Sequence, residues 1–317
     1  MSLSETLGTS YAFVFPGQGS QYVGMAKELA ESSDAAREVI EYADGNLGIS
    51  LSDMMFNGPE DQLAETYNSQ PAIFTASVAA LRALEEKAKD EGITLAPTMV
   101  AGHSLGEFTA LVAAGVIGFP TGLRLVRARG EAMMHAGNER PGAMAAVLGM
   151  DDDKLAALVD EAAQGDVLTL ANLNCPGQTV ISGAVEPMER FMEMAKDAGA
   201  RRIARLPISI ASHSALMDPA AATLNELFDD VTFHHPDMPI ISNATGQPLH
   251  TPEEIREELR HHVVRGVNWT ASVQTMIGAG ITTFVEIGPG SVLAGLNRRI
   301  DKTVRTLSLK DLGLTAA

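Results

Sequence analysis

The chain has very little cysteine, few aromatic residues and a deficit of positive charge. Cys175 is the single cysteine among 317 residues, which excludes an internal disulfide and a metal site built from several cysteines. Aromatic residues make up 5% of the chain, and 23 Lys and Arg face 40 Asp and Glu, giving a formal net charge of −17. Binding to nucleic acid or to an anionic membrane surface would work against this charge, so we expect neither.

Long apolar runs are also missing. The start of the chain, MSLSETLGTS, has no basic region followed by an apolar stretch. The most apolar later stretch, residues 110–119, is too short and too interrupted by glycine to span a bilayer. We therefore expect a cytoplasmic protein. Because 45% of the residues are apolar, the chain can form a large core, in one big domain or in a big and a small one.

Strand and helix signals alternate in the outer parts of the chain. Residues 11–15 (YAFVF) are a short apolar run that ends in PGQGSQ, and residues 98–101 (TMVA) lead through GHSLG into the helical EFTALVAAG. The same order recurs late, as TTFVEIGPGS (282–291) and then VLAGLNRRI (292–300). This alternation predicts a mostly parallel sheet with flanking helices.

The middle of the chain has a different order of elements. Strand-like AMAAVLG is followed by a helical segment that begins DDDK, by the two strands VLTLANL and QTVISG, by the helical VEPMERFMEMAKDAGA, and by a fourth strand, RRIARLPISI (201–210). The order β-α-β-β-α-β is that of the ferredoxin-like unit. We therefore predict an α/β fold: an α/β-hydrolase-like large domain (1–135 and 207–317) with an inserted ferredoxin-like small domain (136–206).

A G-x-S-x-G turn is the sharpest local signal for chemistry. It runs from Gly102 to Gly106, with Ser104 at its centre, between a predicted strand and a predicted helix. Such a turn lifts the serine hydroxyl out of the sheet and sets it at a helix N-terminus, where backbone N–H groups can stabilise an oxyanion. We therefore predict that Ser104 is a nucleophile.

A nucleophilic serine needs a base, and the chain has eight histidines. We select His213, because it follows the last strand of the predicted small domain, where the chain returns to the large one. An acid that would complete a triad is not visible from spacing, since Asp218 is better placed to start a helix before Pro219.

Cofactor and metal motifs are not found. The pairs 234–235 and 261–262 are adjacent histidines without a cysteine or acidic cluster beside them, which does not suggest a metal site. The glycine loops that begin at Gly17 and at Gly288 have Tyr22 and Leu293 where a dinucleotide fingerprint has its third glycine. We expect neither a cofactor nor a metal.

Six motifs together resemble one family, the malonyl-CoA:acyl carrier protein transacylases, whose relatives are the acyltransferase domains of polyketide and fatty acid synthases. The motifs span nearly the whole chain and occur in the family's order. They are FVFPGQGSQYVGM (13–25), AGHSLGEFTALVAAG (101–115), RARGEAM (127–133), NLNCPGQTVISG (172–183), ISIASHSALM (208–217) and FVEIGPGSVLAGL (284–296).

The resemblance implies roles for particular residues. Ser104 would be acylated, and His213 would activate first Ser104 and then the thiol of the carrier's phosphopantetheine arm. Arg129 would bind the free carboxylate of a malonyl group, for which a planar guanidinium is well suited. The other implied roles are backbone N–H groups of Gln18 and Leu105 as the oxyanion hole, Met133 in the acyl pocket, and Asn172 and Asn174 along the cleft.

The resemblance also implies which residue orients His213, and it raises the question of where an acyl carrier protein docks. Many family members have a glutamine whose main-chain carbonyl orients the catalytic histidine, and the matching residue here is His262. An acidic carrier protein needs a locally basic surface, for which we select Arg201 and Arg202.

The resemblance thus implies a ping-pong transfer of malonyl from malonyl-CoA to acyl carrier protein, in fatty acid or polyketide synthesis. Three alternatives stay open from the sequence: a serine thioesterase or esterase that uses water, a methylmalonyl-selective acyltransferase, and a carrier-binding protein without activity. The residues before His213, Ala211 and Ser212, do not decide between malonyl and methylmalonyl.

Overall fold

A mostly parallel six-stranded sheet forms the centre of the larger part of the molecule. The computed structural model describes residues 2–316, and in it the strands of this sheet lie in the order β10-β9-β1-β2-β7-β8. All neighbouring pairs are parallel except β7 and β8. The strands are β1 (Tyr11–Phe15), β2 (Met99–Gly102), β7 (Ile240–Ile241), β8 (Pro248–Leu249), β9 (Thr283–Glu286) and β10 (Arg305–Leu307).

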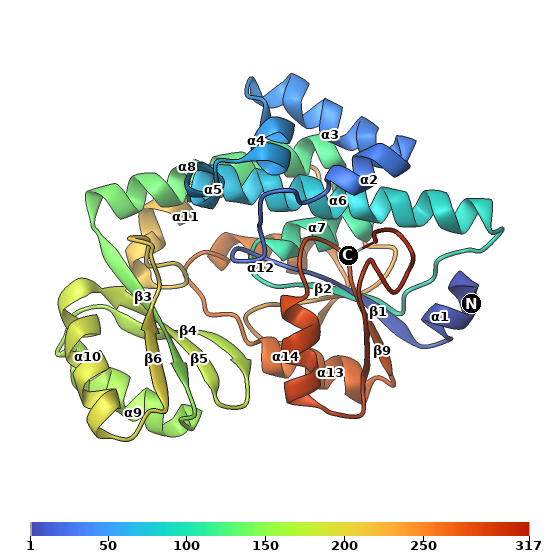
Figure 1. Ribbon diagram of the computed structural model, residues 1–317. Helices are drawn as coiled ribbons and strands as arrows, with labels where there is room; N and C mark the ends of the chain where they lie inside the picture. Colours follow the sequence, from blue (N-terminus) through green and yellow to red (C-terminus); the bar gives the residue numbers. More distant parts are fainter. Residues whose placement is uncertain (1, 317) are drawn as a thin grey trace.

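Helices cover both faces of this sheet, as Figure 1 shows. Along β1 the side chains alternate: Phe13 and Phe15 pack into the larger core, while Ala12 and Val14 pack with Trp269 on the opposite face. The first face is covered mainly by α6 (Thr66–Asp90), α7 (Gly106–Ala113) and α8 (Phe119–Glu139), and the second by α13 (Trp269–Gly278) and α14 (Val292–Ile300). Because all of β1 is buried, it is apolar throughout.

The other helices of the large part lie around these layers. They are α1 (Leu3–Leu7), α2 (Lys27–Ser32), α3 (Asp34–Leu47), α4 (Leu51–Asn57), α5 (Glu60–Ala64), the 3-10 helix η1 (Ala215–Met217), α11 (Asp218–Asp229) and α12 (Pro252–His261). As the sequence predicts, α11 begins at Asp218 with a proline in its first turn.

A second, antiparallel sheet lies beside the first and is covered by two helices of its own (Figure 1). Its strands are ordered β4-β5-β3-β6. In chain order the elements are β3 (Gly142–Leu148), α9 (Asp152–Ala163), β4 (Leu168–Cys175), β5 (Gln178–Ala184), α10 (Val185–Asp197) and β6 (Arg202–Arg205). The predicted β-α-β-β-α-β order, and with it the α/β fold class, is confirmed.

Two boundaries differ from the sequence prediction. The last strand of the small sheet was expected to include PISI, but β6 ends at Arg205. The N–H of Leu206 still donates to the carbonyl of Met144, and Pro207 has no N–H to continue the ladder. The helix α8 runs to Glu139, so its last four residues fall in the segment we assign to the small domain. The division at residues 136 and 206 stays a prediction.

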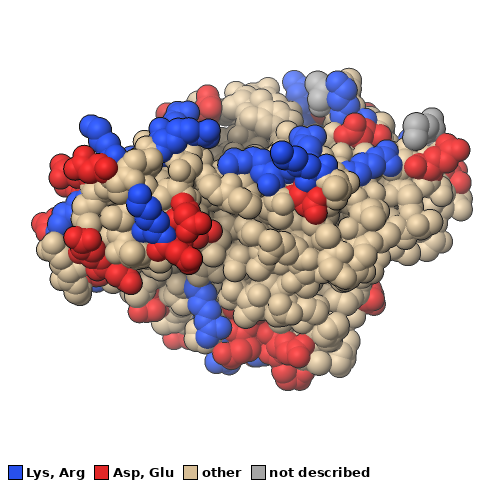
Figure 2. All heavy atoms as spheres, turned by 90° about the horizontal axis from the view of Figure 1, so that it is seen from below, with Lys and Arg blue, Asp and Glu red and all other residues tan. Residues whose placement is uncertain are grey.

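Surface charge is unevenly distributed. Figure 2 shows one face on which Lys and Arg side chains form several groups, some of them beside Asp and Glu side chains. A protein with a negative net charge can therefore still have locally basic areas on its surface. Within residues 2–316, no helix has both the length and the apolar character needed to cross a membrane.

Candidate active site

The G-x-S-x-G turn joins β2 to α7 and holds Ser104 in a left-handed conformation, with φ of 49°. Both glycines are required by close contacts. A Cβ on Gly102 would lie 1.9 Å from the backbone of Gly106, and a Cβ on Gly106 would lie 2.1 Å from the carbonyl oxygen of Phe15. The turn is therefore packed against the end of β1, and it places the Ser104 hydroxyl above the carboxyl edge of the sheet.

Asn243, which follows β7, holds the turn from the neighbouring strand. Its Oδ1 accepts from the N–H of Ser104 at 2.8 Å, and its Nδ2 donates to the carbonyl of Gly102 at 2.8 Å. One side chain thus ties together the two residues on either side of His103. A residue other than glycine in a left-handed conformation costs about 1–3 kcal/mol, and contacts of this kind stabilise it.

His213 lies against the nucleophile. Its Nε2 is 2.9 Å from Oγ of Ser104, and its Nδ1 donates to the main-chain carbonyl of Arg265 at 2.7 Å. A proton on Nδ1 leaves Nε2 free to accept from the serine hydroxyl. The group behind the histidine is therefore a carbonyl and not a carboxylate, which is why the spacing of acidic residues in the sequence reveals no third member.

The expected orienting carbonyl was assigned to the wrong residue. We expected the main-chain carbonyl of His262 to orient His213, but the carbonyl that faces Nδ1 is that of Arg265. The backbone of His213 donates instead to the carbonyl of Val263, at 2.8 Å. The side chain of His262, and not its carbonyl, reaches the nucleophilic turn, where Nε2 lies 3.1 Å from the carbonyl oxygen of Ser104.

Arg129 is buried, with 2% of its surface exposed, and it approaches the nucleophile from α8. Nη2 donates to Oγ of Ser104 at 3.0 Å, and Nη1 donates to Oε1 of Gln70 at 2.7 Å. Its Nε has no hydrogen-bond partner among residues 2–316, and no carboxylate among them lies within 4.0 Å of the guanidinium. Met133, one turn on, is buried, and its Sδ accepts from Nε2 of Gln70 at 3.5 Å.

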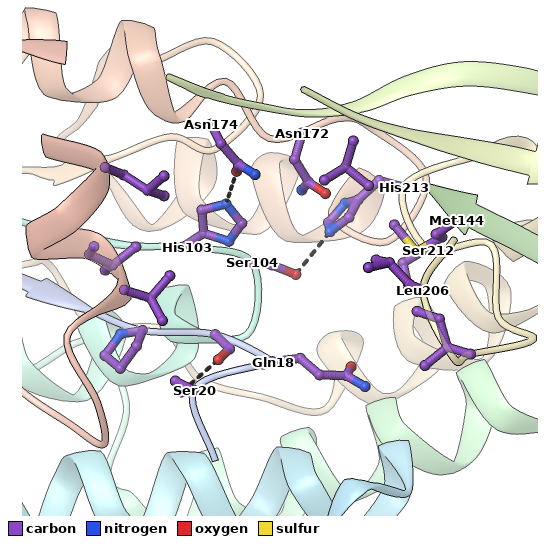
Figure 3. A pocket seen from close by; sticks show the side chains of 18 of the residues that line it. Gln18, Ser20, His103, Ser104, Met144, Asn172, Asn174, Leu206, Ser212 and His213 are labelled. Carbon is purple, nitrogen blue, oxygen red and sulfur yellow. Dashed lines mark hydrogen bonds between the residues drawn. The ribbon is translucent and has the colours of Figure 1, made fainter. Parts of the chain in front are cut away.

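A cavity of about 340 Å³ opens in front of Ser104 and His213, between the two sheets (Figure 3). Gln18 lines it from the loop after β1, and Asn172 and Asn174 line it from β4. Oδ1 of Asn174 accepts from Nε2 of His103 at 2.9 Å. The cavity also includes Leu206, Pro207, Ile208 and Val292, which give one side of it an apolar lining.

Burial sets the ionisation of the groups around the nucleophile. Burial lowers the pKa of His213 well below its ordinary value of 6.5, and nearby His262 and Arg129 lower it further. Burial also lowers the pKa of Arg129, to about 10, so the guanidinium stays charged at neutral pH. The site therefore presents a neutral base and a buried cation within 3.0 Å of the same hydroxyl.

The remaining predicted residues lie in different surroundings. Leu105 follows Ser104 directly at the start of α7, and Gln18 donates through Nε2 to Oγ1 of Thr66 at 3.2 Å. Arg201 and Arg202 are exposed at the start of β6, at the opposite end of that strand from Leu206 at the cavity. Cys175 is buried at the end of β4, and burial raises the pKa of its thiol.

Sequence reasoning missed two side chains that support the site. Asn243 follows a short apolar run, PII, and a polar residue just past a parallel strand is a signal that could have identified it. Gln70 is a fully buried polar residue near the start of α6, and nothing in the helical pattern marks it as a partner of Arg129.

Comparison with known proteins adds a family and named relatives. The acyl transferase domain family matches residues 12–311. The malonyl CoA-acyl carrier protein transacylase of Bacillus subtilis (strain 168) is 44% identical over 301 residues, which are 95% of this chain and 93% of that protein. The protein of the same name from Escherichia coli (strain K12) is 42% identical over 309 residues, 98% of each chain.

Solved structures with the same fold are also found. The malonyl CoA-acyl carrier protein transacylase of Coxiella burnetii has a TM-score of 0.92 and 38% identity, covering 97% of this chain and 96% of that one. A malonyl-transacylase in complex with its type II polyketide synthase acyl-carrier protein has a TM-score of 0.91 and 39% identity, covering 96% of this chain and 98% of that one.

Proposed function

Because this chain belongs to the acyl transferase family and is a malonyl-CoA:acyl carrier protein transacylase, we propose that it transfers the malonyl group through an ester on Ser104, with His213 as the base. Its reaction serves fatty acid or polyketide synthesis, and its substrates are malonyl-CoA and the holo form of acyl carrier protein.

The first half of the proposed reaction acylates the serine. Oγ of Ser104 attacks the thioester carbonyl of malonyl-CoA while Nε2 of His213 takes the hydroxyl proton. Backbone N–H groups of Leu105 and Gln18 would stabilise the oxyanion that forms. The intermediate then collapses, the C–S bond breaks, and the leaving sulfur of coenzyme A takes the proton from His213.

The second half runs the same steps with the carrier. The thiol of its phosphopantetheine arm gives its proton to His213 and attacks the ester carbonyl. The bond to Oγ breaks, and Ser104 recovers its proton from His213. The carbonyl of Arg265 holds Nδ1–H throughout, so the imidazole needs no rotation between the two halves.

The observation on which the malonyl assignment rests is the incompletely paired Arg129. A buried guanidinium that touches the nucleophile and has no carboxylate partner among residues 2–316 provides a binding site for an anion next to the reacting carbonyl. One methylene separates the free carboxylate of a malonyl group from its ester carbonyl, so on Ser104 this carboxylate would be within reach of Arg129. The test is the mass of the protein after brief exposure to malonyl-CoA, which should increase by one malonyl group.

The dependence of the rate on pH should reflect the depressed pKa of His213. The base works only when neutral, so activity is lost as pH falls through its pKa. Since that pKa lies well below 6.5, kcat/KM for malonyl-CoA should stay flat from about pH 8 down to 6.5 and fall only below that value. The measurement is a pH profile of the acylation rate. Loss of half the activity near pH 6.5 would contradict a His213 whose pKa is lowered by burial.

Docking of the carrier on Arg201 and Arg202 is a further proposal, supported by their exposure on the small sheet. Reversing both charges (Arg201→Glu with Arg202→Glu) should raise KM for the carrier about five- to tenfold at low salt, and should leave acylation by malonyl-CoA unchanged. Steady-state assays with varied carrier concentration measure the effect.

A matched pair of substitutions controls for the change in net charge. Lys87→Glu with Lys89→Glu reverses two charges near the end of α6, on the far side of the molecule from β6 (Figure 1). This variant should keep the KM of the original protein for the carrier. If both double variants raise KM equally, the effect is one of net charge and the docking surface lies elsewhere.

We also propose that the enzyme works in the cytoplasm, a proposal that rests on the sequence alone. Cell fractionation followed by an activity assay would test it, and activity in the membrane fraction would count against it.

A further inference from the structure

Two buried polar side chains behind the nucleophile have no part in the mechanism above. Glu107 lies in the first turn of α7, and His262 caps the C-terminal end of α12. The side chains are 1% and 2% exposed. Burying two ionisable groups is costly unless they are paired, so their presence here calls for a physical reason.

The two side chains contact each other next to the carbonyl oxygen of Ser104. Nε2 of His262 lies 3.1 Å from this oxygen and 3.0 Å from Oε2 of Glu107. The backbone N–H of Glu107 donates to the same carbonyl oxygen at 3.0 Å. The imidazole ring also packs edge-on against Phe108, with 5.4 Å between the ring centroids. The carbonyl of the nucleophile is therefore held by two donors, one from each residue.

The protonation of His262 follows from its surroundings. Burial and, to a smaller extent, the positive charge of Arg129 together lower its pKa to about 3, so the imidazole is neutral and has one N–H. Nδ1 has no partner among residues 2–316, whereas the carbonyl oxygen of Ser104 and Oε2 of Glu107 both lie close to Nε2, at 3.1 and 3.0 Å. The proton therefore belongs on Nε2, from which it is donated to the carbonyl of Ser104, with Oε2 of Glu107 beside it at 3.0 Å.

The carbonyl of Ser104 needs such support because the residue is strained. Its φ of 49° is a left-handed conformation, which costs about 1–3 kcal/mol for a residue other than glycine. Asn243 fixes the N–H side of Ser104. His262 fixes the carbonyl side, so the peptide units before and after the nucleophile are each held by a side chain from a different element.

We propose that His262 and Glu107 are a positioning pair for the nucleophile, in which Glu107 orients the imidazole and the imidazole N–H holds the Ser104 carbonyl, so that Oγ stays in line with His213. The proposal rests on Ser104 as the acylated residue. It assigns His262 a role through its side chain, in place of the main-chain role expected from the sequence.

The test compares two replacements of His262 in single-turnover acylation by malonyl-CoA. His262→Phe keeps a ring against Phe108 but removes the N–H, and should lower the saturating acylation rate about 10- to 100-fold, because a small displacement of Oγ is costly in rate. The malonyl-CoA concentration at half saturation should change less than about twofold. His262→Gln supplies an amide N–H at a similar reach and should restore most of the rate.

Replacement of Glu107 tests the other half of the pair. Glu107→Gln keeps a polar oxygen beside Nε2 of His262 and should stay within about threefold of the original rate, whereas Glu107→Leu should lose rate as His262→Phe does. Since both act through one contact, the double variant His262→Phe with Glu107→Leu should be no slower than the slower single variant. Thermal unfolding of each variant shows whether it is folded at the assay temperature.

Two results would overturn the proposal. One is a His262→Phe protein that is acylated at the original rate, and the other is a His262→Gln protein that is as slow as a folded His262→Phe protein. If His262→Phe does not fold, the Glu107→Gln and Glu107→Leu comparison decides instead. If the original protein does not form the Ser104 ester, the proposed function is refuted. If it forms the ester but the variants behave as in the two results above, only the positioning pair is refuted.

Discussion

Replacement of Ser104 by alanine is expected to abolish malonyl transfer, lowering the rate by at least about 10⁴-fold. Oγ of Ser104 is the atom on which His213 and Arg129 converge, at 2.9 and 3.0 Å, and no other hydroxyl in the described part of the chain, residues 2–316, has both partners. Without it the two halves of the reaction share no covalent intermediate. The measurement is transfer of labelled malonyl to holo carrier, together with the mass of the protein after exposure to malonyl-CoA.

The control for this substitution is an exposed serine that is not at the reacting centre. Ser209, exposed and four residues before His213, can be changed to alanine in the same way and should leave transfer within about twofold of the original rate. Alanine at position 104 should not unfold the protein, because its cost in the left-handed conformation is similar to that of serine. A Ser104→Ala protein that still gains a malonyl group would show that the nucleophile is another residue.

Replacement of Arg129 by alanine should change which acyl group is accepted. Loss of a buried, hydrogen-bonded partner of a carboxylate costs about 2–5 kcal/mol, so kcat/KM for malonyl-CoA should fall about 30- to 5,000-fold. Acetyl-CoA has no free carboxylate to pair with Arg129, and its slow transfer should fall much less. The ratio of the two kcat/KM values measures the effect directly.

Arg129→Lys provides the matched comparison, since it keeps the charge but removes the planar pair of donors. Its preference for malonyl should lie between those of the original protein and Arg129→Ala. Because Nη1 of Arg129 also bonds to Gln70, both variants disturb the same neighbour. An equal loss for malonyl-CoA and acetyl-CoA in Arg129→Ala would contradict carboxylate recognition and would leave Arg129 with a structural role.

The parts of the fold that follow from local patterns could be predicted from the sequence. The apolar run 11–15 is β1, the glycine-bracketed turn joins β2 to α7, and the helix 292–300 is α14 with the predicted bounds. The β-α-β-β-α-β order of the small sheet also followed from periodicity and turn residues. The apolar pattern continues past Pro207, but the hydrogen bonds between strands end there. The prediction therefore extended β6 too far.

Site residues that act through a side chain with a sequence signature could be predicted. Those that act through a backbone group could not. Ser104 is marked by its turn, and His213 was placed by its position after the last small-domain strand. Every residue has a main-chain carbonyl, so the sequence does not distinguish that of Arg265. Its contact with His213 depends on the course of the backbone, which only the fold determines. The pairing of His262 with Glu107 joins residues 155 positions apart, beyond the reach of any local pattern.

The most direct test of the account is the fate of the malonyl group on the isolated acyl-enzyme. The protein is loaded with labelled malonyl-CoA, freed of excess substrate, and divided between buffer alone and buffer with holo carrier protein. We expect the label to stay on the protein in buffer and to move to the carrier thiol within one turnover when carrier is added. Rapid release of free malonate at a rate that the carrier does not change would contradict the account and would identify the chain as a hydrolase.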